Sequence, residues 1–185
     1  TDFVLSKSNI QRIDNFQNPK LIVGNQQERL DLSSKNSYMF KSWKTENSPI
    51  LPIFQIEKNK NKNYKLWIHT NTIAERLDLS NKKSLQIFFD RFESFPLLVK
   101  WQNYLSDEIC NAAKFNINEI NDAISLCIEM NSENEIINWS FHLTKVKCSL
   151  LVENQHIDAL LTRKSKGRIT SRILKPIKDY IEDLE

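Results

Sequence analysis

The chain has 185 residues and a formal net charge of +3. Hydrophobic residues make up 40% of the chain and aromatic residues 10%. This is enough apolar side chain to form a core, so the composition excludes a disordered chain and predicts one globular domain over residues 1–185. Lys, Asn and Ile are used heavily, as expected from A+T-rich codons. The positive charge is therefore only a mild indication of an anionic partner.

The three cysteines are odd in number and widely spaced. Cys110, Cys127 and Cys148 each have apolar neighbours, which is not typical of a disulfide framework. No apolar run is long enough to span a membrane, and the first residues lack the charged and apolar regions of a secretory signal. We therefore expect a soluble protein of the cytoplasm or another reducing compartment.

The N-terminal part of the chain predicts short strands. Residues 21–23 and 38–43 are short apolar runs. Residues 50–56 and 64–68 are two further runs that predict a β-hairpin. Its polar connection carries the lysines Lys58, Lys60 and Lys62, which would form a mobile basic tip.

Helical spacing dominates the middle of the sequence. Asn71 or Thr72 is a candidate cap for a short helix, and Leu85, Phe88, Phe89 and Phe92 predict another. Residues 97–105 are expected to be mostly helical, and Ser106 is placed to cap the next helix. The clearest helical pattern covers 116–128, because Asn116 and Glu119 resemble a capping box and an apolar stripe follows, made of Ile117, Ile120, Ile124, Cys127 and Ile128.

From Ile137 the apolar period changes to two, which predicts a strand. Ile137, Trp139, Phe141 and Leu143 would form its core face, and Asn138, Ser140, His142 and Thr144 its wet face. Val146, Cys148, Leu150 and Val152 alternate in the opposite phase, so a turn or bulge is expected at Thr144–Lys145. A final amphipathic pattern, interrupted by Pro176, predicts two helical segments or one kinked helix docked on the sheet. These elements together predict an α+β fold, a mainly antiparallel sheet with amphipathic helices packed on one face.

One six-residue segment occurs twice. Glu-Arg-Leu-Asp-Leu-Ser covers residues 28–33 and again 75–80. A weak internal duplication of 20–37 and 65–84 would explain the match, since repeats of this period are known. Chance in a biased composition is the alternative.

Residues 73–89 resemble a helix-turn-helix, with Ala74 at the small-residue position. In that motif Lys82, Lys83 and Gln86 would face DNA. Two departures are Asp78 where glycine is usual and Leu85, which comes one place late. Two short helices packed into a core are the alternative.

A second basic segment lies near the C-terminus. Residues 163–178 contain seven positive charges and no negative one, carried by Arg163, Lys164, Lys166, Arg168, Arg172, Lys175 and Lys178. Such a run can neutralise several phosphates of a nucleic acid. A solvated loop and helix face is the alternative.

His142-Leu143-Thr144 resembles half of the His-x-Thr pair of the two-histidine phosphoesterases, in which two histidines act as general acid and base. His69 is the candidate partner, but Asn71 occupies the position of the second hydroxyl. The alternative is a histidine on a polar strand face.

Other chemistry finds less support in the sequence. Cys148, His156 and Asp158 are close in sequence but too few for a structural zinc site, so we expect no metal. Two isolated glycines cannot form a phosphate-binding loop, and we expect no cofactor. The four tryptophans, Trp43, Trp67, Trp101 and Trp139, are expected to be core residues, with Trp43 the least certain.

The function predicted is that of a small non-enzymatic binding protein that engages nucleic acid or another anionic partner through its basic segments. A protein-interaction or assembly factor, whose surface charge is incidental, is the competing class. A two-histidine phosphoesterase is the remote third.

Overall fold

The structure, a computed structural model, describes residues 28–41, 51–58, 63–78, 80, 95–97, 100–103, 105, 107–161 and 172–184. The chain divides into two compact units. The larger unit comprises residues 27–44, 50–72 and 114–185, and the smaller comprises 1–26, 45–49 and 73–113. The single domain expected over 1–185 stays a prediction. None of the described helices is long and apolar enough to cross a membrane.

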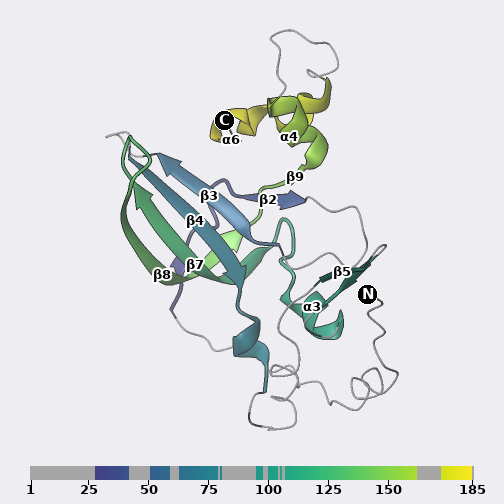
Figure 1. The fold of residues 1–185 in the computed structure, drawn as a ribbon. Helices are drawn as coiled ribbons and strands as arrows, with labels where there is room; N and C mark the ends of the chain where they lie inside the picture. Colours follow the sequence, from purple (N-terminus) through teal and green to yellow (C-terminus); the bar gives the residue numbers. More distant parts are fainter. Residues whose placement is uncertain are drawn as a thin grey trace, which may run out of the picture. The chain divides into compact units, whose positions relative to one another are not determined.

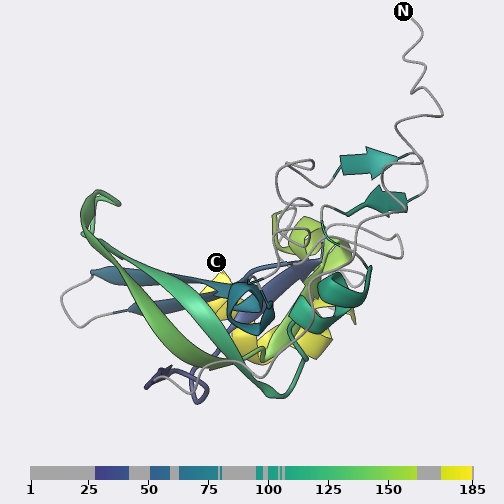
Figure 2. The same ribbon diagram turned by 90° about the horizontal axis from the view of Figure 1, so that it is seen from below.

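The larger unit is built on a seven-stranded sheet with the order β1-β8-β7-β4-β3-β2-β9 (Figure 1). Its strands are β1 (Leu30–Asp31), β2 (Tyr38–Lys41), β3 (Ile53–Lys58), β4 (Tyr64–Asn71), β7 (Ile120–Met130), β8 (Ile136–Lys147) and β9 (Leu150–Glu153). The pairs from β8 to β2 are antiparallel, whereas β1 pairs parallel to β8 and β9 pairs parallel to β2. Figure 2 shows the long β7–β8 hairpin curving beyond the rest of the sheet.

The predicted fold class is wrong. The sheet is mixed, because both of its edge pairs are parallel, and the described helices are few and short. They are η1 (Ile73–Arg76), α3 (Asp107–Ala113), α4 (Asn154–Leu161), η2 (Lys175–Tyr180) and α6 (Ile181–Leu184). In the described part of the chain, no layer of amphipathic helices covers a face of the sheet.

The core of the larger unit lies on one face of the sheet, which we call the inner face. Ile53, Trp67, Ala123, Cys127 and Val146 are buried there at alternate positions of four strands. Leu32 and Phe115, from outside these strands, pack in the same cluster. Burial of these side chains removes apolar surface from water and is the main stabilising contribution to the sheet. The opposite, outer face carries Phe54, Leu66, Leu126 and Trp139.

The helix predicted over 116–128 is wrong, because β7 runs through most of it. The inward residues of β7, Ala123, Ser125 and Cys127, are small, while Ile124, Leu126 and Ile128 point outward. These side chains alternate in size but not in polarity. The hydrophobic pattern of β7 therefore lacks the period of two that normally indicates a strand. Asn116 Nδ2 does donate to Glu119 Oε2 at 2.9 Å, but within a turn that has Asn118 at a φ of 68°.

The strand predicted from Ile137 is confirmed, but the predicted faces and turn are wrong. β8 runs without a break from Ile136 to Lys147, and Thr144 is buried on the inner face in the same phase as Val146. The Thr144 hydroxyl is buried because it is hydrogen-bonded to Ser125 Oγ at 2.6 Å. The apolar residues expected in the core, Ile137, Trp139 and Phe141, are exposed instead.

Several other predicted elements can be compared directly. β2, the β3–β4 hairpin, a helix starting at Asp107 and helical structure on both sides of Pro176 are confirmed. The mostly helical stretch 97–105 is wrong, since β5 (Phe95–Leu97) and β6 (Lys100–Gln102) pair antiparallel there. Helix α4 was not predicted. The strand at 21–23 and the helix of Leu85 to Phe92 lie outside the described residues.

The two copies of the repeated segment form the same local turn. Ser33 donates its backbone N–H and its hydroxyl to Asp31 Oδ1 at 2.9 and 2.7 Å. Ser80 makes the same two bonds to Asp78 Oδ1, at 3.1 and 2.6 Å. Asp side chains favour this local bonding wherever they precede such a turn. The shared turn is therefore compatible with duplication but does not require it.

Candidate nucleic-acid interface

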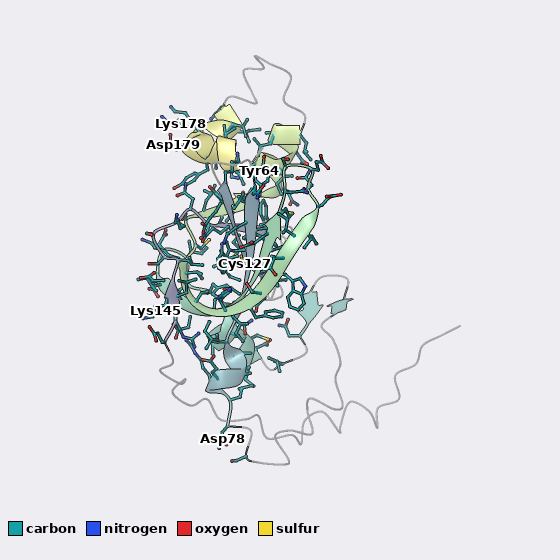
Figure 3. All side chains as sticks on the ribbon, turned by 90° about the vertical axis from the view of Figure 1, so that its left-hand side faces the viewer. Tyr64, Asp78, Cys127, Lys145, Lys178 and Asp179 are labelled. Atoms are coloured by element: carbon teal, nitrogen blue, oxygen red, sulfur yellow. The ribbon has the colours of Figure 1, made fainter. Side chains whose placement is uncertain are left out.

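The basic residues near the C-terminus form a row in the part that the structure describes. Arg172, Lys175 and Lys178 are three residues apart and all exposed. Lys175 and Lys178 belong to η2, a 3-10 helix, in which side chains three residues apart lie above one another. We call Arg172, Lys175 and Lys178 the basic row. Figure 3 shows Lys178 at the surface of this helix.

The opposite side of η2 anchors the basic row. Leu174 and Ile177 are buried and pack with Ala159 of α4 and with Leu150 of β9. Pro176 is the second residue of η2, which directly follows the helical residues 172–174. At the end of η2 the Tyr180 ring meets the Tyr38 ring edge-on, with centroids 5.9 Å apart. The helix therefore has a buried apolar side and a charged wet side.

One acid lies next to the basic row. Lys178 Nζ is 3.9 Å from Asp179 Oδ1, and the two side chains are 70% and 79% exposed. Ion pairs this exposed contribute little, because water screens both charges. This pair therefore takes little from the charge of Lys178, although Glu182, Asp183 and Glu185 also follow the basic row in the sequence.

Most of the other predicted contacts lie outside the described residues. Arg163, Lys164, Lys166 and Arg168 do, and so do Lys82, Lys83 and Gln86. Of the hairpin-tip lysines, Lys58 is exposed at the end of β3, while Lys60 and Lys62 lie outside.

The helix-turn-helix is not supported. Ile73–Arg76 forms a single 3-10 turn. Leu77, just after it, is buried with Leu105, Ile109 and Cys110 of the smaller unit. Arg76 Nη1 also donates to the carbonyl oxygen of Ala112, in α3, at 3.2 Å. The described half of the motif therefore packs on α3 as a short turn.

The two histidines of the phosphoesterase hypothesis lie on the inner face, on either side of β7. In the sheet register, Ser125 of β7 is opposite both His69 of β4 and His142 of β8. His69 has an exposed fraction of 0%, and its Nδ1 is 2.7 Å from Ser125 Oγ. Burial lowers the pKa of His69 to about 4. A general acid or base must reach its substrate, so a fully buried His69 argues against this chemistry.

The environment of His69 contains further buried polar atoms. The Trp67 and His69 rings are stacked, with centroids 6.2 Å apart, and Gln55 is opposite Trp67 in the register. Trp67 Nε1, Gln55 Oε1 and His69 Nε2 are buried and have no hydrogen-bond partner within the described structure. A charge on His69 would therefore be poorly stabilised, which agrees with the direction of its pKa shift.

Metal ligands and thiols can be assessed only in the described residues. No group of three or more His, Cys, Asp or Glu side chains there is placed to hold a metal ion. Cys110, Cys127 and Cys148 are buried and form no disulfide, and burial raises the pKa of the Cys127 and Cys148 thiols. The candidate zinc ligand His156 accepts a hydrogen bond at Nδ1 from the backbone N–H of Glu153.

Sequence reasoning missed an exposed aromatic pair on the outer face. Trp139 and Phe141 are 62% and 66% exposed, and their rings meet edge-on with centroids 5.8 Å apart. Of the two tryptophans whose side chains the structure describes, Trp67 is buried and Trp139 is exposed, whereas the side chains of Trp43 and Trp101 lie outside the described residues. A sequence pattern could have predicted this exposure. The alternation continues unbroken from His142 to Cys148, which places the odd-numbered residues of β8 on the outer face.

Solved structures share this fold at low sequence identity. An active-site mutant of Dss1 exoribonuclease from Candida glabrata is 15% identical with a TM-score of 0.64, covering 92% of this chain and 24% of that one. Yeast Ssd1, a pseudonuclease, is 12% identical with a TM-score of 0.65, covering 86% and 20%. Mycoplasma genitalium RNase R in complex with double-stranded RNA is 12% identical with a TM-score of 0.65, covering 97% and 32%.

These likenesses concern the fold, and the chain spans only between a fifth and a third of the three solved chains. A comparison with curated protein sequences finds no match. A family model, that of the RNB domain, matches residues 29–185, which is most of the chain. The chain therefore belongs to the RNB domain family.

Proposed function

We propose that this chain is an RNA-binding domain and that the basic row on η2 contacts the phosphate backbone. The exposure of Lys175 and Lys178 on the wet side of the anchored helix η2, with exposed Arg172 three residues before them, carries the proposal. Cations held on a rigid element neutralise phosphates and release condensed counterions, which gives affinity without sequence preference. RNase R, which shares the fold, has been solved in complex with RNA, and this favours RNA over DNA as the ligand.

Arg163, Lys164, Lys166 and Arg168 extend the proposed contact, because they directly precede the basic row in sequence. Lys82, Lys83 and Gln86 are proposed as a secondary contact on sequence grounds alone. The competing class, a protein-interaction or assembly factor, would leave all these charges solvated. A titration with RNA separates the two classes. A protein-interaction factor would show no RNA binding at low salt, or an affinity that does not depend on salt.

We further propose that the chain binds RNA without hydrolysing it. An exoribonuclease and a pseudonuclease both share this fold, so the fold is compatible with either activity. The support for binding alone is chemical. The inner-face carboxylates Glu57 and Glu129 accept contacts from Gln55 and Lys65, at 2.9 and 2.6 Å, rather than facing each other as a metal-binding pair.

The test is a titration of the chain with fluorescent random-sequence RNA across a salt series. We expect the logarithm of the association constant to fall linearly with the logarithm of salt, with a slope of about −0.7 per phosphate contacted. Three to seven contacts thus predict slopes of roughly −2 to −5. The same samples, analysed on a gel after incubation with Mg²⁺ or Mn²⁺, should keep full-length RNA. A slope near zero would refute RNA binding, and shortened RNA would refute the absence of hydrolysis.

A further inference from the structure

One edge of the sheet is open along β8. On the side away from β7, β8 pairs with β1 only, at Thr144 and Lys145. Residues 136–143 therefore have no strand beside them on that side in the described part of the chain. Figure 3 shows Lys145, one of the two β8 residues that pair with β1, at the edge of the sheet. Backbone N–H and C=O groups on an open edge are a template for another strand.

The open part of β8 lacks the features that normally protect an edge strand. Residues 136–143 contain no charged residue and no proline. Four of their large apolar side chains are exposed, namely Ile136, Ile137, Trp139 and Phe141. Proteins usually protect such an edge with lysine, proline or a covering element, because long apolar edges associate. An edge of this composition fits a partner that pairs with it.

The charges around this edge favour a polypeptide partner over RNA. Lys145 lies opposite Asp122 in the register and near Asp31, whose pKa is lowered mainly by hydrogen bonds from Ser33 and also by Lys145. Arg29 Nε is 3.4 Å from Asp122 Oδ1. Lys145 and Arg29 at this end of β8 thus lie beside acids, whereas a phosphate backbone requires an excess of positive charge.

We infer that β8 pairs with β8 of a second copy of this chain, antiparallel and about a two-fold axis at Ser140. This register places Trp139 opposite Phe141 of the second copy, twice, on the outer face. Asn138 then lies opposite His142 of the second copy on the inner face. No two like charges meet, because 136–143 are uncharged. A strand edge is self-complementary under a two-fold axis, which is the commonest symmetry of homo-oligomers.

The first test measures the oligomeric state of the full chain by sedimentation across a concentration series. We expect a monomer–dimer equilibrium in which Trp139→Lys and Phe141→Lys each raise the dissociation constant about 10-fold to 100-fold, since each removes aromatic pairs and adds charge. Ile120→Lys is the matched control. Ile120 is 61% exposed on β7, away from the open edge, and its replacement should leave the equilibrium unchanged.

The second test fixes the register without destabilising substitutions. Ser140→Cys brings two thiols together at the two-fold axis and should give a disulfide-linked dimer under mild oxidation, because directly opposed Cβ atoms are about 5 Å apart. The three native cysteines are buried and give a low background. A chain that stays monomeric, or a dimer indifferent to Trp139→Lys and Phe141→Lys, would overturn the inference. So would a monomer whose RNA affinity falls with these two substitutions, because the edge would then be an RNA platform.

Discussion

Replacing Arg172, Lys175 and Lys178 together by alanine is expected to weaken binding of single-stranded RNA about 100-fold at roughly 0.1 M salt. Each phosphate contact contributes about 0.7 to the salt slope, and at 0.1 M this corresponds to about fivefold in affinity per contact. Three contacts therefore multiply to about two orders of magnitude, and the slope itself should become shallower by about 2. Fluorescence anisotropy with random-sequence RNA across a salt series measures both quantities.

The matched control replaces three exposed lysines elsewhere on the larger unit, Lys35, Lys41 and Lys114, and removes the same charge. If the effect comes from local contact, the control should keep most of the slope. Equal losses in the two variants would mean that overall charge, not the basic row, governs binding. Alanine at Arg163, Lys164, Lys166 and Arg168 should make the slope shallower by up to about 3 if that segment continues the contact.

Acidification from about pH 6.5 to pH 4 is expected to remove up to about 3 kcal/mol of folding stability through His69 alone. Burial holds the pKa of this group at about 4 in the folded chain, against an ordinary value of 6.5. Between these values the unfolded chain binds a proton that the folded chain does not. Stability is therefore complete above the unfolded pKa, decreases as the pH falls, and loses nothing further from this group below about pH 4.

Guanidinium unfolding at several pH values measures this loss. His69→Gln keeps a polar side chain beside Ser125 but cannot titrate. Its free energy of unfolding should therefore fall less between about pH 6.5 and pH 4, by the contribution of His69. His142→Gln is the control, because His142 lies across β7 on the same face but is only half-buried. Identical pH profiles for the unsubstituted chain and His69→Gln would contradict the assignment.

The sheet illustrates how far local patterns predict this fold. The β3–β4 hairpin was predictable because two apolar runs flank a polar connection of ordinary hairpin length. β7 was not, because its inward residues are small and its outward residues are large and apolar, so that both faces appear apolar. The parallel pairs that join β1 to β8 and β9 to β2 link segments more than 100 residues apart, and no local pattern encodes them.

The candidate site divides in the same way. The basic character of residues 163–178 was evident from the sequence, since counting charges requires no knowledge of neighbours. Which cations share one side of η2, and that Leu174 and Ile177 hold this helix on the body of the larger unit, became clear only from the structure. Trp139 and Phe141 were assigned to the core because an alternating strand does not indicate which of its faces is covered.

The sequence by itself indicated the anionic class of partner that is proposed for the chain, because a charge run and its salt-dependent chemistry are properties of composition. It also determined the strands β2, β3, β4 and β8, because hydrophobic period is local. Only the tertiary structure decided which face of β8 is buried, that His69 is inaccessible, and that no described strand pairs with residues 136–143 on the side away from β7. These depend on which distant segments lie beside a residue, and burial and accessibility arise from those neighbours rather than from the residue itself.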